Sequence, residues 1–554
     1  MNRRDFLRFA GAGFAVGAVA LVAACQPSTP ASSGSASSAD APTAAPGQQS
    51  TTRGGELIIG MTAGNVPIPN TPPDQGGEGS RFVGYNIYNA LTQLNVEQGD
   101  TSPVPSPALA TRWSVGPDKL TWTFNLRPGV KFHDGTALDA GAVEFQFNRI
   151  MNKNFQYYDP VSAGALASNV LSIDTFRAVD DATFEIKTKY PDSFIPWEMM
   201  IMIPSPSAIK QYGNQDYVNH ASGTGPFIMS KYIDGQVMEL TPNPEYYDGP
   251  PKIDKITLFP MPEPNTRLSA LNSGQVNWAE VPPPDSVDQL KANNFQVLLK
   301  QYPHAIILAL NCTIEPFNNP MVRQALQYAI DKDSMCNSLL NHCGTPAYQW
   351  MYPGHPWFNQ ELGQRYTYDP TKAKQMLAQA GYGSGLSITI PYPSSGSGNM
   401  WPPPMMELIQ QNFKAIGIEM TTVPMEWLTI VSMYRAGFGS PDNAKYHGMY
   451  FSPNTASPAN MLNFTQGRIQ PAGCCNVYNF ADSGVDQNVA AEMAEFDQGK
   501  DDALINQGMG LVAESSPATY VCHDLNLRVL APSVHGFVQP QAWVADFTKV
   551  TVDT

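Results

Sequence analysis

Histidine and cysteine are the side chains of this sequence best suited to acid–base, nucleophilic or metal chemistry, and the chain has 8 histidines and 7 cysteines. The histidines are scattered. His523 and Asp524 are adjacent, but neighbours on a strand point to opposite faces, so they do not form the pair of a catalytic triad. The motifs GxSxG, HExxH and GxxxxGK[ST] do not occur in the sequence. The sequence therefore predicts a protein that is not an enzyme.

The cysteines allow two kinds of site. Apart from Cys25, the sequence contains Cys312, Cys336, Cys343, Cys474, Cys475 and Cys522. An even number suits disulfides in an oxidising compartment, although the possible pairings are many, and Cys336 with Cys343 could close a small loop. His342 beside Cys343 raises zinc as an alternative, but the CxxC and HxxxH spacings of zinc sites are absent from the sequence. We expect neither a metal site nor a cofactor.

Aromatic residues gather next to prolines in one part of the chain, where the sequence has Tyr348, Trp350, Tyr352, Trp357 and Trp401. Flat indole faces suit the C–H faces of sugar rings, and they also suit cationic or apolar ligands. A single tryptophan of this kind more often packs in a core or against a loop. As a group, they indicate a binding surface in this part of the chain.

The N-terminus has the features of an export and anchoring segment. The sequence NRRDFLR, with Arg3 and Arg4, is typical of a twin-arginine signal, and the apolar stretch that follows is shorter than the roughly 20 residues that span a membrane. Val22 to Cys25, VAAC, resembles a bacterial lipobox, which predicts a signal peptide over 1–24 and a lipid on Cys25. The alternative is an ordinary signal peptide that ends in cysteine. Residues 25–53 are rich in Ser, Ala, Pro, Thr and Gly, which predicts a flexible tether.

Composition narrows the possible partners. The formal net charge is −15, and it becomes −17 once the three arginines and one aspartate of residues 1–24 are removed. An acidic chain without a basic run after its N-terminus disfavours nucleic acid and anionic lipid as partners. Together with the signals at the N-terminus, this composition leads us to expect a lipid-anchored monomer in the periplasm or on the outer face of the cell membrane.

Residues 120–150 show most clearly which elements the chain forms. Leu120 to Leu126 alternate apolar and polar residues, which predicts a half-buried strand. Pro128-Gly129 and Asp134-Gly135 predict turns around a short strand with Val130 and Phe132. Asp139 is placed to cap a helix whose apolar face contains Val143, Phe147 and Ile150.

The same reasoning predicts further elements. We expect strands at residues 57–60, 183–187, 227–229, 237–240 and 305–312, with Asp234-Gly235 as a hairpin turn. We expect helices at residues 82–94, 322–330 and 370–380, the last of them capped by Asp369 and ended by Gly381.

The wording TWTFNLRPGVKFHDGTALDA resembles the signature of the large solute-binding proteins that serve ABC importers, the peptide, nickel and oligosaccharide binding family. Four further blocks resemble the same family in the same order: SGTGPF with NPEYYDG, TRLSALNSGQVNWAE, VRQALQYAID and YDPTKAKQMLAQAGY. Because the matches run through nearly all of the chain after the tether, the resemblance argues against a purely structural surface protein.

The resemblance implies an α/β fold of two lobes joined by a hinge, with an extra inserted subdomain (type II, cluster C-like). The first lobe would comprise residues 54–84, 222–308 and 523–554, the extra subdomain residues 85–221, and the second lobe residues 309–522. The hinge would lie near residues 304–312 and 521–526. A small solute would bind between the lobes, and the loaded form would be recognised by the transmembrane permease subunits.

The identity of the solute is left between alternatives. Peptide-binding relatives hold the ligand's ammonium group with an Asp in a W-x-x-D-Y-x-D-P segment, whereas the corresponding stretch here, HGMYFSPN, contains no Asp. An oligopeptide is the main reading, an oligosaccharide the alternative, and a nickel chelate ranks third. The expected ligand-binding residues are Tyr450, Ser452, Asn454, Trp401, Trp350 and Asn311.

Overall fold

The computed structural model describes residues 54–97, 99–452, 457–468 and 476–553. The chain divides into two units, 1–51 and 52–554, and the description below concerns the second unit alone. Cys25, Asn454, Cys474 and Cys475, which the sequence singles out, lie outside the described residues.

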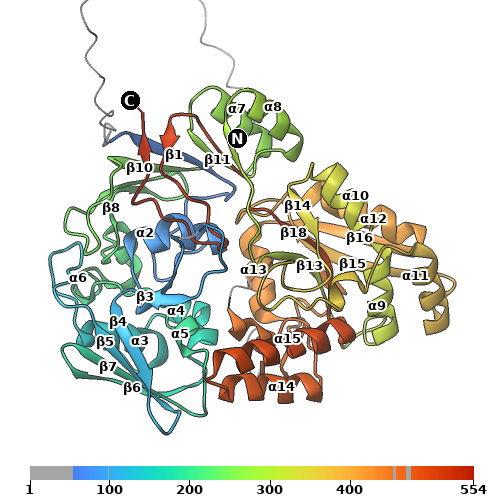
Figure 1. Ribbon diagram of the computed structural model, residues 1–554, viewed down its shortest axis with the longest axis horizontal. Coiled ribbons are helices and arrows are strands. Elements are labelled where there is room, and N and C mark those ends of the chain that lie inside the picture. Colours follow the sequence, from blue (N-terminus) through green and yellow to red (C-terminus); the bar gives the residue numbers. More distant parts are fainter. Residues whose placement is uncertain (1–53, 98, 453–456, 469–475, 554) are drawn as a thin grey trace, which may run out of the picture. The chain divides into compact units, whose positions relative to one another are not determined.

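The first lobe is built on a seven-stranded sheet assembled from distant parts of the chain (Figure 1). Its strand order is β12 (Gln296–Leu298), β19 (Arg528–Leu530), β11 (Trp278–Glu280), β1 (Glu56–Met61), β10 (Lys255–Pro260), β9 (Val237–Pro242) and β8 (Phe227–Ile233). The central strand β1 pairs in parallel with β10 and β11, whereas β19 runs antiparallel to both of its neighbours. The other elements of this lobe are α1 (Gly76–Gly79), η1 (Ser80–Gly84), α7 (Pro264–Asn272), η4 (Pro284–Ser286), α8 (Val287–Ala292), β20 (Val534–His535) and β21 (Thr551–Val552).

An inserted subdomain follows η1 and ends before β8. Its sheet has the order β4 (Ala110–Val115), β5 (Thr121–Leu126), β7 (Thr183–Thr188) and β6 (Ile173–Asp180), and α3 (Ala140–Met151) covers it (Figure 1). The remaining elements are α2 (Tyr85–Ile87), β2 (Thr92–Leu94), β3 (Pro105–Pro107), α4 (Pro160–Ala165), η2 (Ala167–Val170), α5 (Ile195–Glu198), α6 (Pro206–Asp216) and η3 (Tyr217–Asn219).

The second lobe contains a four-stranded sheet and a separate parallel pair. The four-stranded order is β14 (Gly344–Pro346), β18 (Ala518–Asp524), β13 (Ala305–Leu310) and β17 (Gly448–Phe451), and the pair is β15 (Leu386–Pro393) with β16 (Ile418–Met425). Its longer helices are α9 (Pro320–Ala329), α11 (Pro370–Leu377), α12 (Pro402–Ala415), α13 (Trp427–Ala436), α14 (Ser483–Ala494) and α15 (Gln498–Ser515). Shorter helical turns are α10 (Lys332–Ser334), η5 (Met335–Leu339), η6 (Leu362–Gln364), η7 (Ala378–Tyr382), η8 (Pro458–Phe464) and η9 (Gln466–Arg468).

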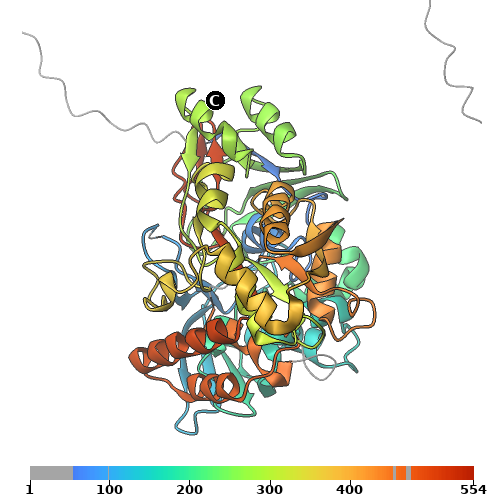
Figure 2. The same ribbon diagram turned by 90° about the vertical axis from the view of Figure 1, so that its right-hand side faces the viewer.

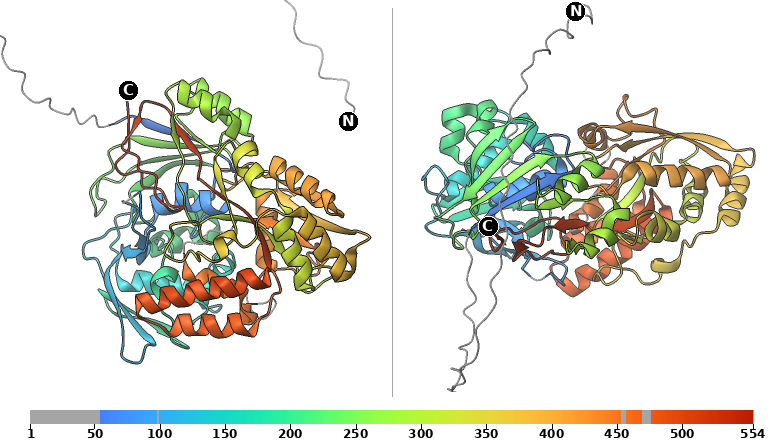
Figure 3. Two further views of the ribbon diagram at one scale, coloured as in Figure 1. Left: turned by 45° about the vertical axis from the view of Figure 1, so that its right-hand side comes forward. Right: turned by 90° about the horizontal axis from the view of Figure 1, so that it is seen from above.

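Two chain segments cross between the lobes. One joins β12 to β13 through residues 299–304, and the other joins β18 to β19 through residues 525–527. These crossings lie beside the hinge positions that the sequence predicts. Seen from above, the sheet of the first lobe and the elements of the second lobe lie on opposite sides of the molecule (Figure 3).

Most of the elements expected from local patterns are confirmed. The strands β1, β5, β7, β8, β9 and β13 and the helices α3, α9 and α11 form where the alternation and the caps place them. Asp139 accepts a hydrogen bond from Ala142 N, and Asp369 accepts one from Lys372 N, so both are N-caps as expected.

Two expectations are wrong. The helix expected over residues 82–94 ends at Ile87, and Thr92–Leu94 instead forms β2. The backbone of these residues bonds to distant segments, because Gly225 N–H donates to Ile87 O and Ala110 N–H donates to Leu91 O. The strand expected around Val130 is a single bridge between Lys131 and Ala137.

The cysteines also differ from the expectation. Cys312, Cys336, Cys343 and Cys522 are free thiols, so the suggested loop between Cys336 and Cys343 is wrong. Cys343 Sγ instead lies 3.7 Å from Asn341 O, and Cys336 contacts the Cys522 thiol. The described residues contain no cluster of three His, Cys, Asp or Glu side chains that could hold a metal ion. Within the same residues, no helix has the length and apolar character needed to cross a membrane.

Candidate functional site

The largest of the cavities that we describe lies between the two lobes and the inserted subdomain, with a volume of about 800 Å³. Gly76, Gly77 and Trp543 line it from the first lobe, and Ser168 and Trp197 line it from the subdomain. The second lobe contributes α13, the end of β17 and η8. Six aromatic side chains form much of its surface: Tyr85, Trp197, Trp427, Tyr434, Phe451 and Trp543.

Three of these rings form a stack on the second lobe. Trp427 begins α13, whose N-cap Glu426 accepts a hydrogen bond from Thr429 N, and Tyr434 lies two turns further along the same helix. Phe451 ends β17, and its ring lies 4.0 Å from that of Tyr434 and 5.9 Å from that of Trp427, nearly parallel to both. Helix and strand together therefore present flat aromatic surface to the cavity.

The charges at this cavity are few and cationic. Arg435, which follows Tyr434 on α13, and His304, at the first crossing, are the only lining residues with charged or titratable nitrogen, and the described lining residues include no carboxylate. Burial lowers the pKa of the Arg435 guanidinium. The cavity thus offers a partner for a ligand carboxylate.

His304 connects the two crossings to the cavity wall. Its Nδ1 contacts Asp524 Oδ2, at the end of β18, and the hydroxyl of Tyr302 at 2.9 Å. Its Nε2 lies 3.0 Å from the Ser452 carbonyl oxygen. Asp524 therefore pairs with His304, and not with the adjacent His523, whose ring lies beside Tyr352.

A loop of the second lobe closes one edge of the cavity against the first lobe. Gly77 N–H donates to Ser397 Oγ at 3.0 Å, and Gly398 N–H donates to Thr62 Oγ1 at 2.6 Å. Thr62 in turn donates to the buried carboxylate of Glu78, whose pKa is raised by burial. Ser397 and Gly398 have φ angles of 53° and 70°, a left-handed backbone that makes this close approach possible.

A second bridge joins the inserted subdomain to the second lobe. Ser193 N–H donates to Met493 O at 2.9 Å, and Ser193 Oγ donates to Glu492 O at 3.1 Å, both at the end of α14. Phe194 belongs to the hydrophobic core of the second lobe. In the turned view, α14 and α15 lie beside the subdomain strands (Figure 2). The second lobe is therefore hydrogen-bonded both to the first lobe and to the inserted subdomain.

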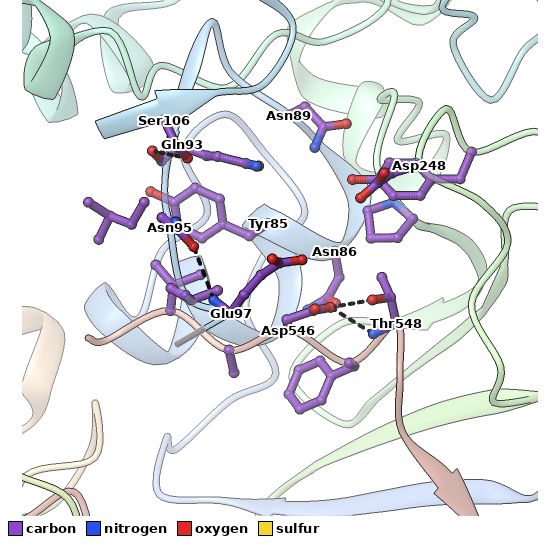
Figure 4. Close-up of a pocket in the computed structure, with 17 residues that line it drawn as sticks. Tyr85, Asn86, Asn89, Gln93, Asn95, Glu97, Ser106, Asp248, Asp546 and Thr548 are labelled. Carbon is purple, nitrogen blue, oxygen red and sulfur yellow. Dashed lines mark hydrogen bonds between the residues drawn. The ribbon is translucent and has the colours of Figure 1, made fainter. Parts of the chain in front are cut away.

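A smaller cavity of about 280 Å³ adjoins the larger one, with which it shares Tyr85, Leu94 and Val544 (Figure 4). It differs in charge, because Glu97, Asp248 and Asp546 line it together with several amides. Asp546 accepts from the Thr548 backbone and hydroxyl, and Glu97 pairs with Lys549 at 3.3 Å.

Of the described residues that the sequence predicts to bind ligand, the structure places one at the larger cavity and others in the core of the second lobe. Ser452 lines the larger cavity. Tyr450 is fully buried in the second lobe, with its hydroxyl 4.0 Å from Met405 Sδ, and Trp350 packs against Phe464 and Tyr520. The remaining described residues of the set are Asn311, which donates to Tyr446 O and accepts from Thr313, and Trp401, which packs on the core at the start of α12. A ligand contact of any of these residues stays a prediction.

Sequence reasoning missed most of the aromatic wall. Trp427 and Tyr434 belong to one helix, but Trp427 and Trp543 are 116 residues apart in the sequence, so no spacing could show that they meet. Phe451 lies within the HGMYFSPN stretch that the family resemblance singles out, and this stretch is the one feature of the sequence that points to the aromatic wall.

Residues 104–471 match the family described as bacterial extracellular solute-binding proteins, family 5. The chain belongs to this family. Heme-binding protein A of Haemophilus influenzae is 28% identical over 504 residues, which are 84% of this chain and 87% of that protein. The glutathione-binding protein GsiB of Pectobacterium atrosepticum is 32% identical over 400 residues, which are 67% and 73% of the two chains.

Solved structures of the family share the fold. The periplasmic binding protein DppA of Helicobacter pylori, in complex with the peptide STSA, has a TM-score of 0.79 at 25% identity and covers 91% of this chain and 99% of its own. The two-lobed fold and the family expected from the sequence are thereby confirmed. A family-5 solute-binding protein is a transport receptor and not an enzyme.

Proposed function

We propose that this family-5 protein is the extracytoplasmic receptor of an ABC importer, that it captures an oligopeptide-like solute in the larger cavity, and that it delivers the solute to the permease. The observation that carries this proposal is the 800 Å³ cavity between two lobes joined by two crossings. This volume lies in the range of about 300–1,000 Å³ typical of small-molecule sites. Closure about the crossings would bury the solute.

Two relatives support a peptide-like solute. GsiB is named for glutathione, which is a tripeptide, and the DppA structure holds a four-residue peptide. In this chain, a peptide carboxylate would find a cation in Arg435.

The amino end of a peptide needs an opposite charge when it is buried. The described lining residues of the larger cavity supply none, whereas the adjoining smaller cavity has Glu97, Asp248 and Asp546. A peptide with its amino end toward the smaller cavity and its carboxylate toward Arg435 would therefore meet opposite charges at both ends.

Calorimetric titration with peptides of two to five residues tests this function. We expect binding by the protein, weaker binding of the same peptides after C-terminal amidation, and a further loss after N-terminal acetylation. Binding that is indifferent to both modifications would contradict the proposed orientation. A protein that binds no peptide but binds sugars would contradict the peptide reading as a whole.

An oligosaccharide is the second candidate, and the stacked rings of Trp427, Phe451 and Tyr434 favour it. Neutral oligosaccharides in the same titration distinguish the two candidates, because their binding would not depend on Arg435. A nickel chelate ranks third, since the described residues offer no metal-binding cluster.

The anchoring of the protein rests on its sequence. We propose export by the twin-arginine signal around Arg3 and Arg4 and lipidation of Cys25. Incorporation of labelled palmitate into the full chain, compared with Cys25→Ser, tests the anchor, and retention of Arg3→Lys/Arg4→Lys in the cytoplasm tests the route. Equal labelling of both chains would contradict lipidation at Cys25.

A further inference from the structure

Two fully buried arginines meet around one carboxylate beside the second crossing. Arg81 comes from η1, and Arg528 begins β19, directly after the crossing segment 525–527. Arg81 Nη2 lies 3.0 Å from Glu280 Oε2, and Arg528 Nε lies 3.1 Å from Glu280 Oε1. Glu280 also accepts from Trp278 Nε1 at 2.7 Å. One carboxylate thus serves two guanidinium groups and an indole.

The donors of this cluster outnumber its acceptors. Among the described residues, Arg528 Nη1 and Nη2, Arg81 Nε and Asn526 Nδ2 are buried without a hydrogen-bond partner. Arg81 Nη1 donates to Asn526 Oδ1 at 3.3 Å, and Gln539 Nε2 donates to Asn526 O at 2.7 Å, which joins these residues in one network. Gln539 Oε1 is the one acceptor of this network that lacks a partner in the described part of the chain.

In two other buried arginines, every guanidinium nitrogen donates a hydrogen bond. Arg267 is fully buried and donates to the carbonyl oxygens of Met261, Pro262, Glu280 and Val281. Arg149 pairs with Asp159 at 2.7 Å and donates to surrounding amides and hydroxyls. In contrast, neither Nη group of Arg528 has a hydrogen-bond partner among the described residues. The cluster is therefore exceptional within its own fold.

The walls of the cluster restrict what can fill it. The Arg528 guanidinium lies 5.8 Å from the ring centres of Trp278 and Phe537, and Arg81 lies 4.6 Å from that of Trp543. Burial and the charge of Arg81 lower the pKa of Arg528 to about 10, so it stays charged at neutral pH. Within the part of the chain that the structure describes, the carboxylate of Glu280 and the nearby carboxylate of Glu78 leave both Nη groups of Arg528 without a partner, and buried donors on a cation suit an acceptor that carries negative charge.

We propose that a small inorganic anion of the chloride class binds at Arg528 and Arg81, where it accepts hydrogen bonds from the Arg528 Nη groups and from Asn526 Nδ2. Chloride accepts N–H groups from several directions, which suits donors on different elements, and it is small enough for an aromatic enclosure. This site lies beside the larger cavity, with which it shares the Trp543 side chain as a wall. Because Asn526 and Arg528 flank the end of the second crossing, the anion would fasten that segment to η1 of the first lobe.

Crystals of the full chain grown in sodium bromide test the proposal directly. We expect an anomalous bromide peak within hydrogen-bond distance of Arg528 Nη1 or Nη2 and Asn526 Nδ2. A water molecule in that position, or bromide peaks confined to the protein surface, would overturn the proposal.

Thermal unfolding of the full chain provides a second readout. At constant ionic strength, replacing sodium gluconate by sodium chloride should raise the melting temperature in a saturable way, since the anion binds the folded chain only. In Arg528→Lys, which keeps the charge but loses the fork of donors, the chloride-dependent rise should fall by more than half. Arg177→Gln, which changes an exposed arginine on β6, should keep the full rise. An equal rise in a folded Arg528→Lys protein would overturn the proposal, and the bromide crystal of the unchanged chain decides if that variant does not fold.

Discussion

Lys332 is a cation buried in the core of the second lobe. Its Nζ donates to Ala347 O at 2.8 Å and lies 4.6 Å from the ring centre of Tyr348, and burial lowers its pKa to about 7. The unfolded chain, with a lysine pKa near 10.5, binds more protons than the folded chain between these two values. The free energy of unfolding should therefore rise with pH from about 7 toward 10.5.

We expect Lys332→Met to remove this rise, which has a limiting slope of about 1.4 kcal/mol per pH unit. Denaturant unfolding at several pH values measures it. Lys372 also lies over a tyrosine ring, but it is exposed, so Lys372→Met is the matched control and should leave the slope unchanged. A slope that persists in Lys332→Met would assign the pH dependence to another group.

Glu492 on α14 should change the free energy of unfolding with pH in the opposite direction. It is fully buried, it contacts Asn488, and both burial and the nearby Asp501 raise its pKa to about 8. The folded chain here binds more protons than the unfolded chain, so stability is complete below pH 4.5 and falls as the pH rises toward 8. Glu492→Gln should therefore unfold at higher denaturant than the unchanged chain at pH 9 and lose most of this advantage at pH 4.5. Glu419→Gln, at an exposed position on β16, should show no such difference.

At this scale the sequence predicted residue types better than residue roles. Caps such as Asp139 and Asp369 act on backbone groups three residues away, so their roles follow from local sequence. The aromatic wall depends on contacts between α13, β17 and the C-terminal segment, which no local pattern encodes. Ser452 could be placed only because the family resemblance supplied an alignment.

At the scale of elements, the position of α1 depends on the absence of a side chain at Gly77. A Cβ atom on Gly77 would lie 1.4 Å from Trp543 Nε1, so the indole packs directly on the backbone of this helix. Gly77→Ala should displace Trp543 and weaken ligand binding by more than tenfold, as measured by calorimetry. Gly164 also lines the cavity, but a Cβ there meets no atom within 4 Å, so Gly164→Ala should bind with nearly unchanged affinity.

The loop that carries Ser397 should contribute to closure. Ser397→Ala removes the acceptor of the Gly77 N–H, an interaction worth about 0.5–1.5 kcal/mol. We therefore expect the dissociation constant to rise roughly 2- to 10-fold, mainly through faster dissociation measured by stopped-flow. Ser394→Ala, which removes a bond within the second lobe, should leave the dissociation rate unchanged. Equal effects of the two changes would contradict a role of this loop in closure.

Elements were predictable wherever their hydrogen bonds are local. The helix expected over residues 82–94 failed because Gly223 and Gly225 lie against the carbonyl of Ile87, where a side chain could not fit. Gly225 N–H donates a hydrogen bond to the carbonyl oxygen of Ile87, and the residues that follow Ile87, Thr92–Leu94, pair with residues 105–107. A contact with a segment more than a hundred residues away in sequence therefore ended a helix that its own residues favour.

At the scale of the whole molecule, the order of the family blocks predicted two lobes and an insertion, but not which strands meet. The seven-stranded sheet of the first lobe depends on the strand that comes last in its sequence, because β19 lies between β11 and β12 and is the only strand in the described part of the chain with which β12 pairs. A chain that ends at Asp524 should keep the strands of the second-lobe sheet and lose this one. We expect limited proteolysis to digest its first lobe while fragments of residues 305–524 persist. Equal resistance of both lobes would contradict this dependence.

The position of β19 also has a consequence for synthesis. The ribosome makes a protein from its N-terminus at roughly 5–20 residues per second, and domains commonly fold as they emerge. Here β1 is made early and its neighbour β10 follows about 200 residues later, but the sheet remains open until residues 528–530 leave the exit tunnel. After β11 and β12 have been made, their edges stay unpaired over the roughly 230 residues that separate β12 from β19 in the sequence, and unpaired strand edges of this kind associate with other chains. We therefore expect the nascent chain to need chaperones until residues 528–530 have been made.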